Sequence, residues 1–304
     1  MTMERVSTAG LNQATLNATL ALQGRYATAV EQQSSGLKAA QYTDYGAKAK
    51  LLVSLESTLS QAQTWADSAQ TALDRVEAMH SAIGSMTDLL TSMRSTLSGA
   101  LSDTSDSDGI DINAYGQTRL DDLASLMNLQ QDGRYLFAGS ITDTAPVDVS
   151  ALSAPASPSS ADTSYYQGDG DIAAVRIGKQ QSISYGVTAD SAAFEKALRA
   201  ANIVASLTAS PLDETALSEA YDLATAALDE LLAVQGSLSL SANRLETAHQ
   251  SKQDDVTVIT ERVSDVKSVD VAAVAAEVTQ YETQLQASYS AIASISKVSL
   301  LDYL

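Results

Sequence analysis

The stretch LVSLESTLSQAQTWADSAQTALDRVEAMHSAIGSMTDLLTSMRSTL, residues 52–97, decides the fold. A row of side chains spaced three and four residues apart runs through it, and eleven of its fourteen positions are apolar. The row is Leu52, Leu55, Leu59, Ala62, Ala66, Ala69, Leu73, Val76, His80, Ile83, Thr87, Leu90, Arg94 and Leu97. Such a row, sustained over six heptads, is typical of a coiled coil. We therefore expect residues 46–99 to form one helix of about 80 Å.

Both ends of the chain show the same kind of spacing. Near the C-terminus, Val271, Val278, Leu285 and Ile292 occupy one heptad position, and Val274, Tyr281 and Ile295 occupy another. The first 30 residues carry a weaker row that includes Val6, Leu16, Leu20 and Val30. Shorter helices are expected over residues 111–131 and 191–208, and a long helix over 213–265, with Asp213 at its start.

The middle of the chain has a different character. All four prolines lie between Pro146 and Pro211, and residues 141–163 are rich in Ser, Ala and Pro. In residues 164–188 the apolar side chains alternate with polar ones, as Val175 and Ile177 do around Arg176, which predicts a β-hairpin. The fold class is therefore mainly α, with long antiparallel coiled-coil helices, paired terminal helices and a small β-rich insertion.

This pattern divides the chain into three expected domains. Residues 1–44 with 256–304 form a terminal-helix core domain. Residues 45–140 with 190–255 form a long-helix coiled-coil domain. Residues 141–189 form a small β-rich outer domain.

Composition limits the possible functions. The net charge is −19 and the pI is near 4.3, so the chain is not expected to bind nucleic acid or an anionic membrane surface. Cysteine is absent, which removes thiol nucleophiles and cysteine metal sites. Polar residues such as Asn12 and Gln23 interrupt any apolar core of a cleaved signal peptide near the N-terminus.

Segments that resemble catalytic or metal sites fail on inspection. DTSDSDGID, residues 103–111, is similar to a calcium loop, but the twelfth position is Tyr115 where a bidentate Glu is needed. GDGDIA, residues 168–173, leads into an expected strand, whereas a dinucleotide site leads into a helix. The two histidines, His80 and His249, have no partners nearby in the sequence. We expect no catalytic, cofactor or metal site, and no enzymatic activity.

The two terminal helices carry more apolar side chains than they can bury against each other, because each helix shields the other on one side only. The last ten residues, ISKVSLLDYL, are also strongly apolar. We therefore expect the ends to be marginally ordered in the free monomer and to pack against other copies of the chain. The predicted assembly interface consists of Val6, Leu16, Leu20, Val30, Val271, Val274, Val278, Tyr281, Leu285, Ile292, Ile295, Val298, Leu300 and Leu301.

Motifs at the ends and in the centre resemble a known family. Arg5-Val6-Ser7-Thr8, Ser34-Ser35-Gly36-Leu37-Lys38 and the ending LQASYSAIASISKVSLLDYL are similar to motifs of the bacterial flagellin superfamily. Within it, GRYLFAGSITDTAP (133–146), YYQGD (165–169) and the ending Leu-Asp-Tyr-Leu resemble the hook–filament junction family, the third hook-associated protein.

This resemblance implies a structural, non-catalytic flagellar subunit that joins hook to filament. Its implied partners are copies of itself, a hook-associated protein, flagellin, and a cytosolic export chaperone at the C-terminal helix. It also implies secretion by the flagellar type III route to an extracellular flagellum, without cleavage of a signal. Two alternatives stay open: a subunit of the filament itself, and, more distantly, a cytoplasmic coiled-coil adaptor.

Overall fold

The computed structural model describes residues 2–102, 111–156, 158–207 and 213–301. The chain divides into two compact units, Met1–Ser60 with Val256–Leu304 and Gln61–Asp255. The mainly helical fold class is confirmed, and so are the small antiparallel sheets. The division into three domains stays a prediction. The stretch that resembles a calcium loop and the last three residues of the chain lie almost entirely outside the described residues.

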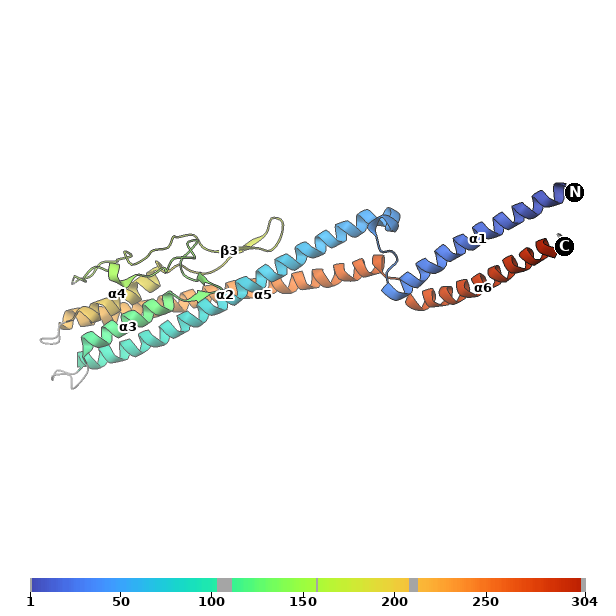
Figure 1. The fold of residues 1–304 in the computed structure, drawn as a ribbon. Coiled ribbons are helices and arrows are strands. Elements are labelled where there is room, and N and C mark those ends of the chain that lie inside the picture. Colours follow the sequence, from blue (N-terminus) through green and yellow to red (C-terminus); the bar gives the residue numbers. More distant parts are fainter. Residues whose placement is uncertain (1, 103–110, 157, 208–212, 302–304) are drawn as a thin grey trace. The chain divides into compact units, whose positions relative to one another are not determined.

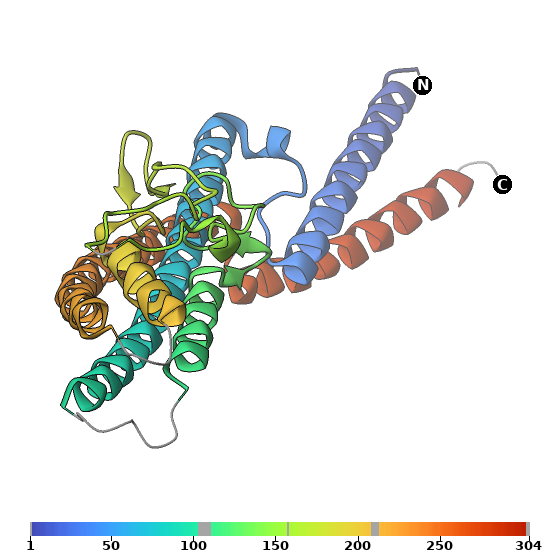
Figure 2. The same cartoon turned by 90° about the vertical axis from the view of Figure 1, so that its left-hand side faces the viewer.

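Two terminal helices, α1 (Thr2–Ser35) and α6 (Val271–Leu301), pair in the first unit. They run antiparallel and side by side in both views, with the two chain termini at the same end of the pair (Figures 1 and 2). On α1 the covered row is Thr15, Thr19, Leu22, Tyr26 and Ala29. On α6 it is Val274, Val278, Tyr281, Leu285, Ser288 and Ile292. Both rows alternate steps of four and three residues, as in a two-stranded coiled coil.

The long helices are α2 (Ala49–Ser102) and α5 (Glu214–Lys267), close to the bounds predicted for them. Asp213 starts α5 as expected, because its carboxylate accepts hydrogen bonds from the backbone N–H groups of Thr215 and Ala216 at 3.0 and 3.1 Å. A short 3₁₀ segment, η1 (Tyr42–Lys48), precedes α2. The 54-residue length of each long helix is possible because no proline interrupts it.

The predicted row on α2 is wrong at one of its two heptad positions after Ala69. In the second unit the buried residues at one heptad position are those predicted, from Ala62 through Val76 to Leu97. At the other position the buried residues are Ala72, Met79, Met86 and Met93. The predicted residues there were Leu73, His80, Thr87 and Arg94, and His80 is exposed. Stepping by three and then four from Ala69 gives an unbroken apolar row, and this more apolar face enters the core.

The core of the second unit combines α2 and α5 with two shorter helices, α3 (Ile112–Met127) and α4 (Ala192–Ser206). The start of α3 packs very closely against the end of α4. A Cβ atom added to Gly116 would lie 2.3 Å from the backbone nitrogen of Ala205. Only glycine therefore fits at this crossing.

Irregular chain and two small hairpins complete this core (Figure 2). The predicted hairpin is β3 (Ala174–Arg176) paired with β4 (Ser182–Ser184), with Val175 opposite Ile183. A second hairpin, β1 (Gln130–Gln131) with β2 (Arg134–Tyr135), was not predicted. Its turn is Asp132-Gly133, and both residues have positive φ angles. An Asp-Gly pair is a strong hairpin signal, so the sequence did contain the information.

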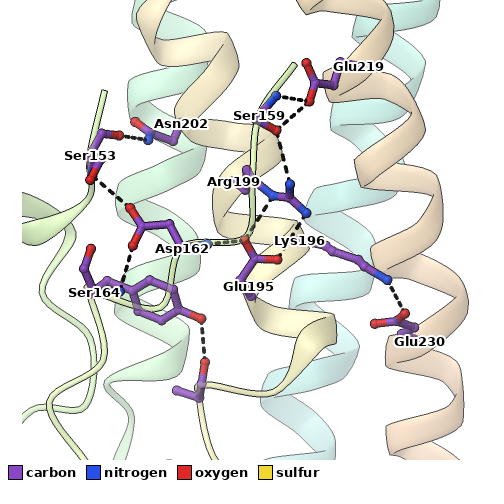
Figure 3. A network of polar contacts seen from close by, with 12 residues as sticks. Ser153, Ser159, Asp162, Ser164, Glu195, Lys196, Arg199, Asn202, Glu219 and Glu230 are labelled. Atoms are coloured by element: carbon purple, nitrogen blue, oxygen red, sulfur yellow. Dashed lines mark hydrogen bonds and ion pairs between the residues drawn. The ribbon is translucent and has the colours of Figure 1, made fainter. Parts of the chain in front are cut away.

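A polar network fastens the Ser/Pro-rich segment to α4 and α5 (Figure 3). The Arg199 guanidinium pairs with the buried carboxylate of Glu195, with 3.0 Å between Nε and Oε1. Glu195 also accepts a hydrogen bond from the backbone N–H of Asp162 at 3.0 Å. The backbone N–H of Ser159 donates to Glu219 on α5 at 2.7 Å. Residues 158–162, which follow the short 3₁₀ turn η2 (Val149–Ala151), are thus bonded to both helices although they form no strand or helix themselves.

Candidate assembly surface

The α1 helix has a second apolar face that no described residue of the chain covers. Leu16 is 47% exposed and Leu20 is 61% exposed, and Val30 is also exposed. The row that packs on α6, from Thr19 to Ala29, is interleaved with this set along the sequence and faces another direction around the helix. The α1 helix is therefore apolar both where it meets α6 and on a flank of the pair.

Most of the predicted interface residues of α6 that the structure describes face α1, whereas those of α1 lie on its flank. Val274 and Leu285 are buried, and Val278, Tyr281 and Ile292 are half-buried, all on the row that faces α1. Val271, at the first position of α6, is exposed. The structure thus brings five predicted residues of α6 together against α1, and leaves Leu16, Leu20 and Val30 outside that contact. Val6, Ile295, Val298, Leu300 and Leu301 belong to the two helices, but their side chains lie outside the described part of the structure.

The register of the terminal pair is marked by a polar contact. The amide of Gln23 donates a hydrogen bond of 2.7 Å to the hydroxyl of Tyr289. Because both side chains are exposed, the contact borders the apolar row of the pair. Sequence reasoning missed this contact, because the spacing of apolar residues gives no signal for a pair of polar side chains.

A charged cluster, here called the clamp, joins η1, the start of α2 and the end of α5 in the first unit. The Lys267 ammonium forms an ion pair with Glu56 of α2, and the Tyr42 hydroxyl donates to the same carboxylate at 2.7 Å. The Lys267 hydrogen bond, followed by that from Tyr42, lowers the pKa of Glu56. The hydrogen bond with Glu56 raises the pKa of Lys267, and likewise that of Tyr42. The clamp is thus stabilised when Glu56 is ionised and the other two groups are protonated.

The histidines and carboxylates do not gather into a site in the part of the chain that the structure describes. No group of three or more His, Asp or Glu side chains there could hold a metal ion. The Nδ1 atom of His249 lies 3.1 Å from the carbonyl oxygen of Ala66, which is a packing contact between α5 and α2. Among the same residues, no helix is long and apolar enough to cross a bilayer.

Comparisons with known proteins identify the C-terminal region. Residues 221–304 match the family model of the bacterial flagellin C-terminal helical region. This match covers most of α5 and all of α6, so it includes the helix that packs on α1. No curated protein matches the chain in sequence.

Solved structures share the fold at low sequence identity. One is a putative flagellar hook-associated protein from Vibrio parahaemolyticus, with a TM-score of 0.59 and 16% identity over 74% of this chain and 100% of that chain. Another is FlgL from Bacillus cereus, with a TM-score of 0.54 and 14% identity over 69% of this chain and 99% of that chain. The C-terminal region of the chain is thus similar to the C-terminal helical region of bacterial flagellins, and its fold is shared with these two proteins.

Proposed function

We propose that this chain is a non-catalytic structural subunit of the bacterial flagellum that joins the hook to the filament. The flagellin C-terminal match and the flagellar fold support a structural role in the flagellum. The motifs GRYLFAGSITDTAP and YYQGD favour the junction among the possible positions.

The observation that carries the proposal is the uncovered apolar face of α1. Each leucine moved from water into an interface contributes about 1.5–3 kcal/mol. Leu16 and Leu20 stand only four residues apart, so one neighbouring helix can cover both. The α6 row holds α1 within the chain, and the flank of α1 with Leu16 and Leu20 then meets a neighbouring subunit.

Contacts of this kind lead to a repeated assembly. A face of α1 that meets a different face of the next copy forms a heterologous contact, and such contacts build rings or helices. We propose copies of the same chain as lateral neighbours, and a hook-associated protein and flagellin as axial neighbours. Secretion through the flagellar type III apparatus and a cytosolic chaperone at the C-terminal helix complete the proposal. The proposal also includes the three expected domains of the chain and its extracellular location.

A second candidate is a subunit of the filament itself. The family model that matches residues 221–304 describes flagellins, and this match favours it. The two candidates predict different flagellar structures in cells that lack the chain.

The test is electron microscopy of cells that lack the chain, with an assay for flagellin in the medium. Hooks without filaments, together with monomeric flagellin in the medium, are expected for the junction role. Hooks with no flagellin in the medium would show that the chain is the filament subunit. Normal flagella would contradict both candidates.

A further inference from the structure

The break between α5 and α6 contains no proline or glycine, and its local signals are Ser268 and the N-cap residue Asp270. Only Ser268, Val269 and Asp270 separate the two helices, and none of these residues is proline or glycine. Helix breaks almost always occur at such residues, or where another group inserts into the hydrogen-bond ladder. In an uninterrupted helix, the N–H of Val269 would bond to the carbonyl of Asp265, and that of Val271 to the carbonyl of Lys267.

The connector after α1 supplies partners to these backbone groups. The N–H of Val269 donates to the carbonyl of Gly36 at 2.9 Å. The carbonyl of Lys267 accepts from the backbone N–H of Lys38 at 2.7 Å. The carbonyl of Asp265 accepts from the Lys38 ammonium, also at 2.7 Å. Lys38 alone therefore occupies two of the carbonyls that the missing helical bonds leave free, those of Asp265 and Lys267.

Local contacts also shape the connector. Gly36 has a φ angle of +70°, which lets the chain turn directly after α1. The carbonyl of Gln32 accepts from the N–H of Gly36 at 2.8 Å, and the amide of Gln32 donates to the carbonyl of Lys38 at 2.7 Å. Leu37 then faces Ser268 in an antiparallel β-bridge.

We propose that residues 268–270 are a conditional hinge, broken only while the Gly36–Lys38 connector is bound. When the connector leaves, the N–H of Val269 and the carbonyls of Asp265 and Lys267 regain helical partners, and α5 and α6 join into one helix. The hinge lies within the first unit and is a property of the single chain, independent of any assembly role.

Several backbone groups of the hinge have partners in both states. In the bound state, the helix on each side is complete up to the break: Ser268 N–H donates to Ser264, and Val274 N–H donates to Asp270. The Asp270 carboxylate caps the new start by accepting from Ala272 and Ala273 at 2.9 and 3.1 Å. In the released state the Asp270 cap is lost, and the helical backbone hydrogen bonds across residues 268–270 are restored. A small change at the connector is therefore sufficient to shift the equilibrium.

The test uses the full chain and a disulfide lock across the bridge. Leu37 and Ser268 are a non-hydrogen-bonded pair, since their neighbours make the bonds, and such pairs bring the side chains closest. The chain has no cysteine, so Leu37→Cys with Ser268→Cys forms a single defined disulfide. Gly36→Val with Lys38→Met weakens the connector in this background. Cα chemical shifts of Val266–Val271, measured by NMR, report whether the hinge is helical.

The four-substitution variant should show non-helical shifts at 268–270 when oxidised and helical shifts after reduction. The variant with the two cysteines alone should stay non-helical in both conditions, because its connector is intact. Non-helical shifts after reduction, with α6 still helical, would show that the break is intrinsic and overturn the proposal. Loss of helical shifts throughout Val271–Leu285 after reduction would also overturn it, because the released hinge is predicted to extend the helix.

Discussion

The amide of Gln23 donates a hydrogen bond of 2.7 Å to the hydroxyl of Tyr289, across 266 positions of sequence. The contact places the second half of α1 beside the second half of α6 and so fixes the antiparallel register of the pair. This register buries Leu285 against α1 and leaves Leu16 and Leu20 outside. Leu285 is therefore expected to respond to substitution differently from Leu16 and Leu20.

A charge at Leu285 should separate the terminal helices. Leu285 is only 8% exposed, and loss of a buried leucine typically costs about 2–5 kcal/mol. We expect Leu285→Asp to lower the helix content measured by circular dichroism and to expose α1 and α6 to amide exchange. The matched change Leu20→Asp should leave both signals unchanged, because Leu20 is exposed in the pair. Equal loss of helix in both variants would contradict the assignment of the two faces.

A side chain at position 116 should destabilise the second unit. The Cβ atom of Gly116→Ala would lie within 2.3 Å of the Ala205 backbone, so the two helices must move apart. We expect a loss of about 1–3 kcal/mol in the free energy of unfolding, measured with urea. The control Gly99→Ala lies in α2 with open space around it and should gain about 0.5–1 kcal/mol. A neutral Gly116→Ala would show that the α3–α4 crossing is looser than the structure indicates.

The clamp at Glu56 should stabilise the first unit only within a pH window. The folded-state pKa of Glu56 is lowered, so its contribution is present above its unfolded pKa and is lost as the pH falls through the folded pKa. The pKa values of Lys267 and Tyr42 are raised, so their contributions are present at lower pH and lost in strong alkali. Glu56→Gln should therefore cost about 0.5 kcal/mol at pH 7 and nothing in acid, measured by urea unfolding. A cost that persists at pH 2 would contradict this account.

Acid should also release the Ser/Pro-rich segment. Hydrogen bonds from Ser164, and then from the backbone of Ser153, lower the pKa of Asp162 to about 2. On acidification, the Asp162 carboxylate of the unfolded chain binds a proton at a higher pH than that of the folded chain. The stabilisation is therefore complete above about pH 5 and is lost as the pH falls toward 2. Asp162→Asn should cost about 0.5–1.5 kcal/mol at pH 7, and the difference from the natural chain should vanish near pH 2. Urea titrations of both proteins at several pH values check this.

Periodicity predicted the long helices because their apolar rows extend over many turns. It did not predict the phase of one row on α2, where Met79 rather than His80 enters the core. A helix that packs against several neighbours buries a wider face than a two-helix seam, so one spacing template cannot describe it. The Asp132-Gly133 hairpin was recoverable from local turn chemistry.

Other features depend on contacts that no local pattern contains. The break at residues 268–270 contains no proline or glycine. Its freed backbone groups bond to Gly36 and Lys38, more than 200 positions away. The clamp between Glu56 and Lys267 likewise joins distant segments. The α6 row was predicted from its spacing, but the sequence could not say whether α1 or a neighbouring subunit covers it.

The central claim is that the flank of α1 with Leu16 and Leu20 is the assembly surface. Its most direct test is electron microscopy of cells in which the chain is replaced by the Leu16→Asp/Leu20→Asp variant. The control is Ile172→Asp, an equally exposed apolar position in the irregular segment. We expect hooks without filaments for the α1 variant, with the exported variant and flagellin both found in the medium, and normal filaments for the control. Normal filaments with the α1 variant would contradict the claim.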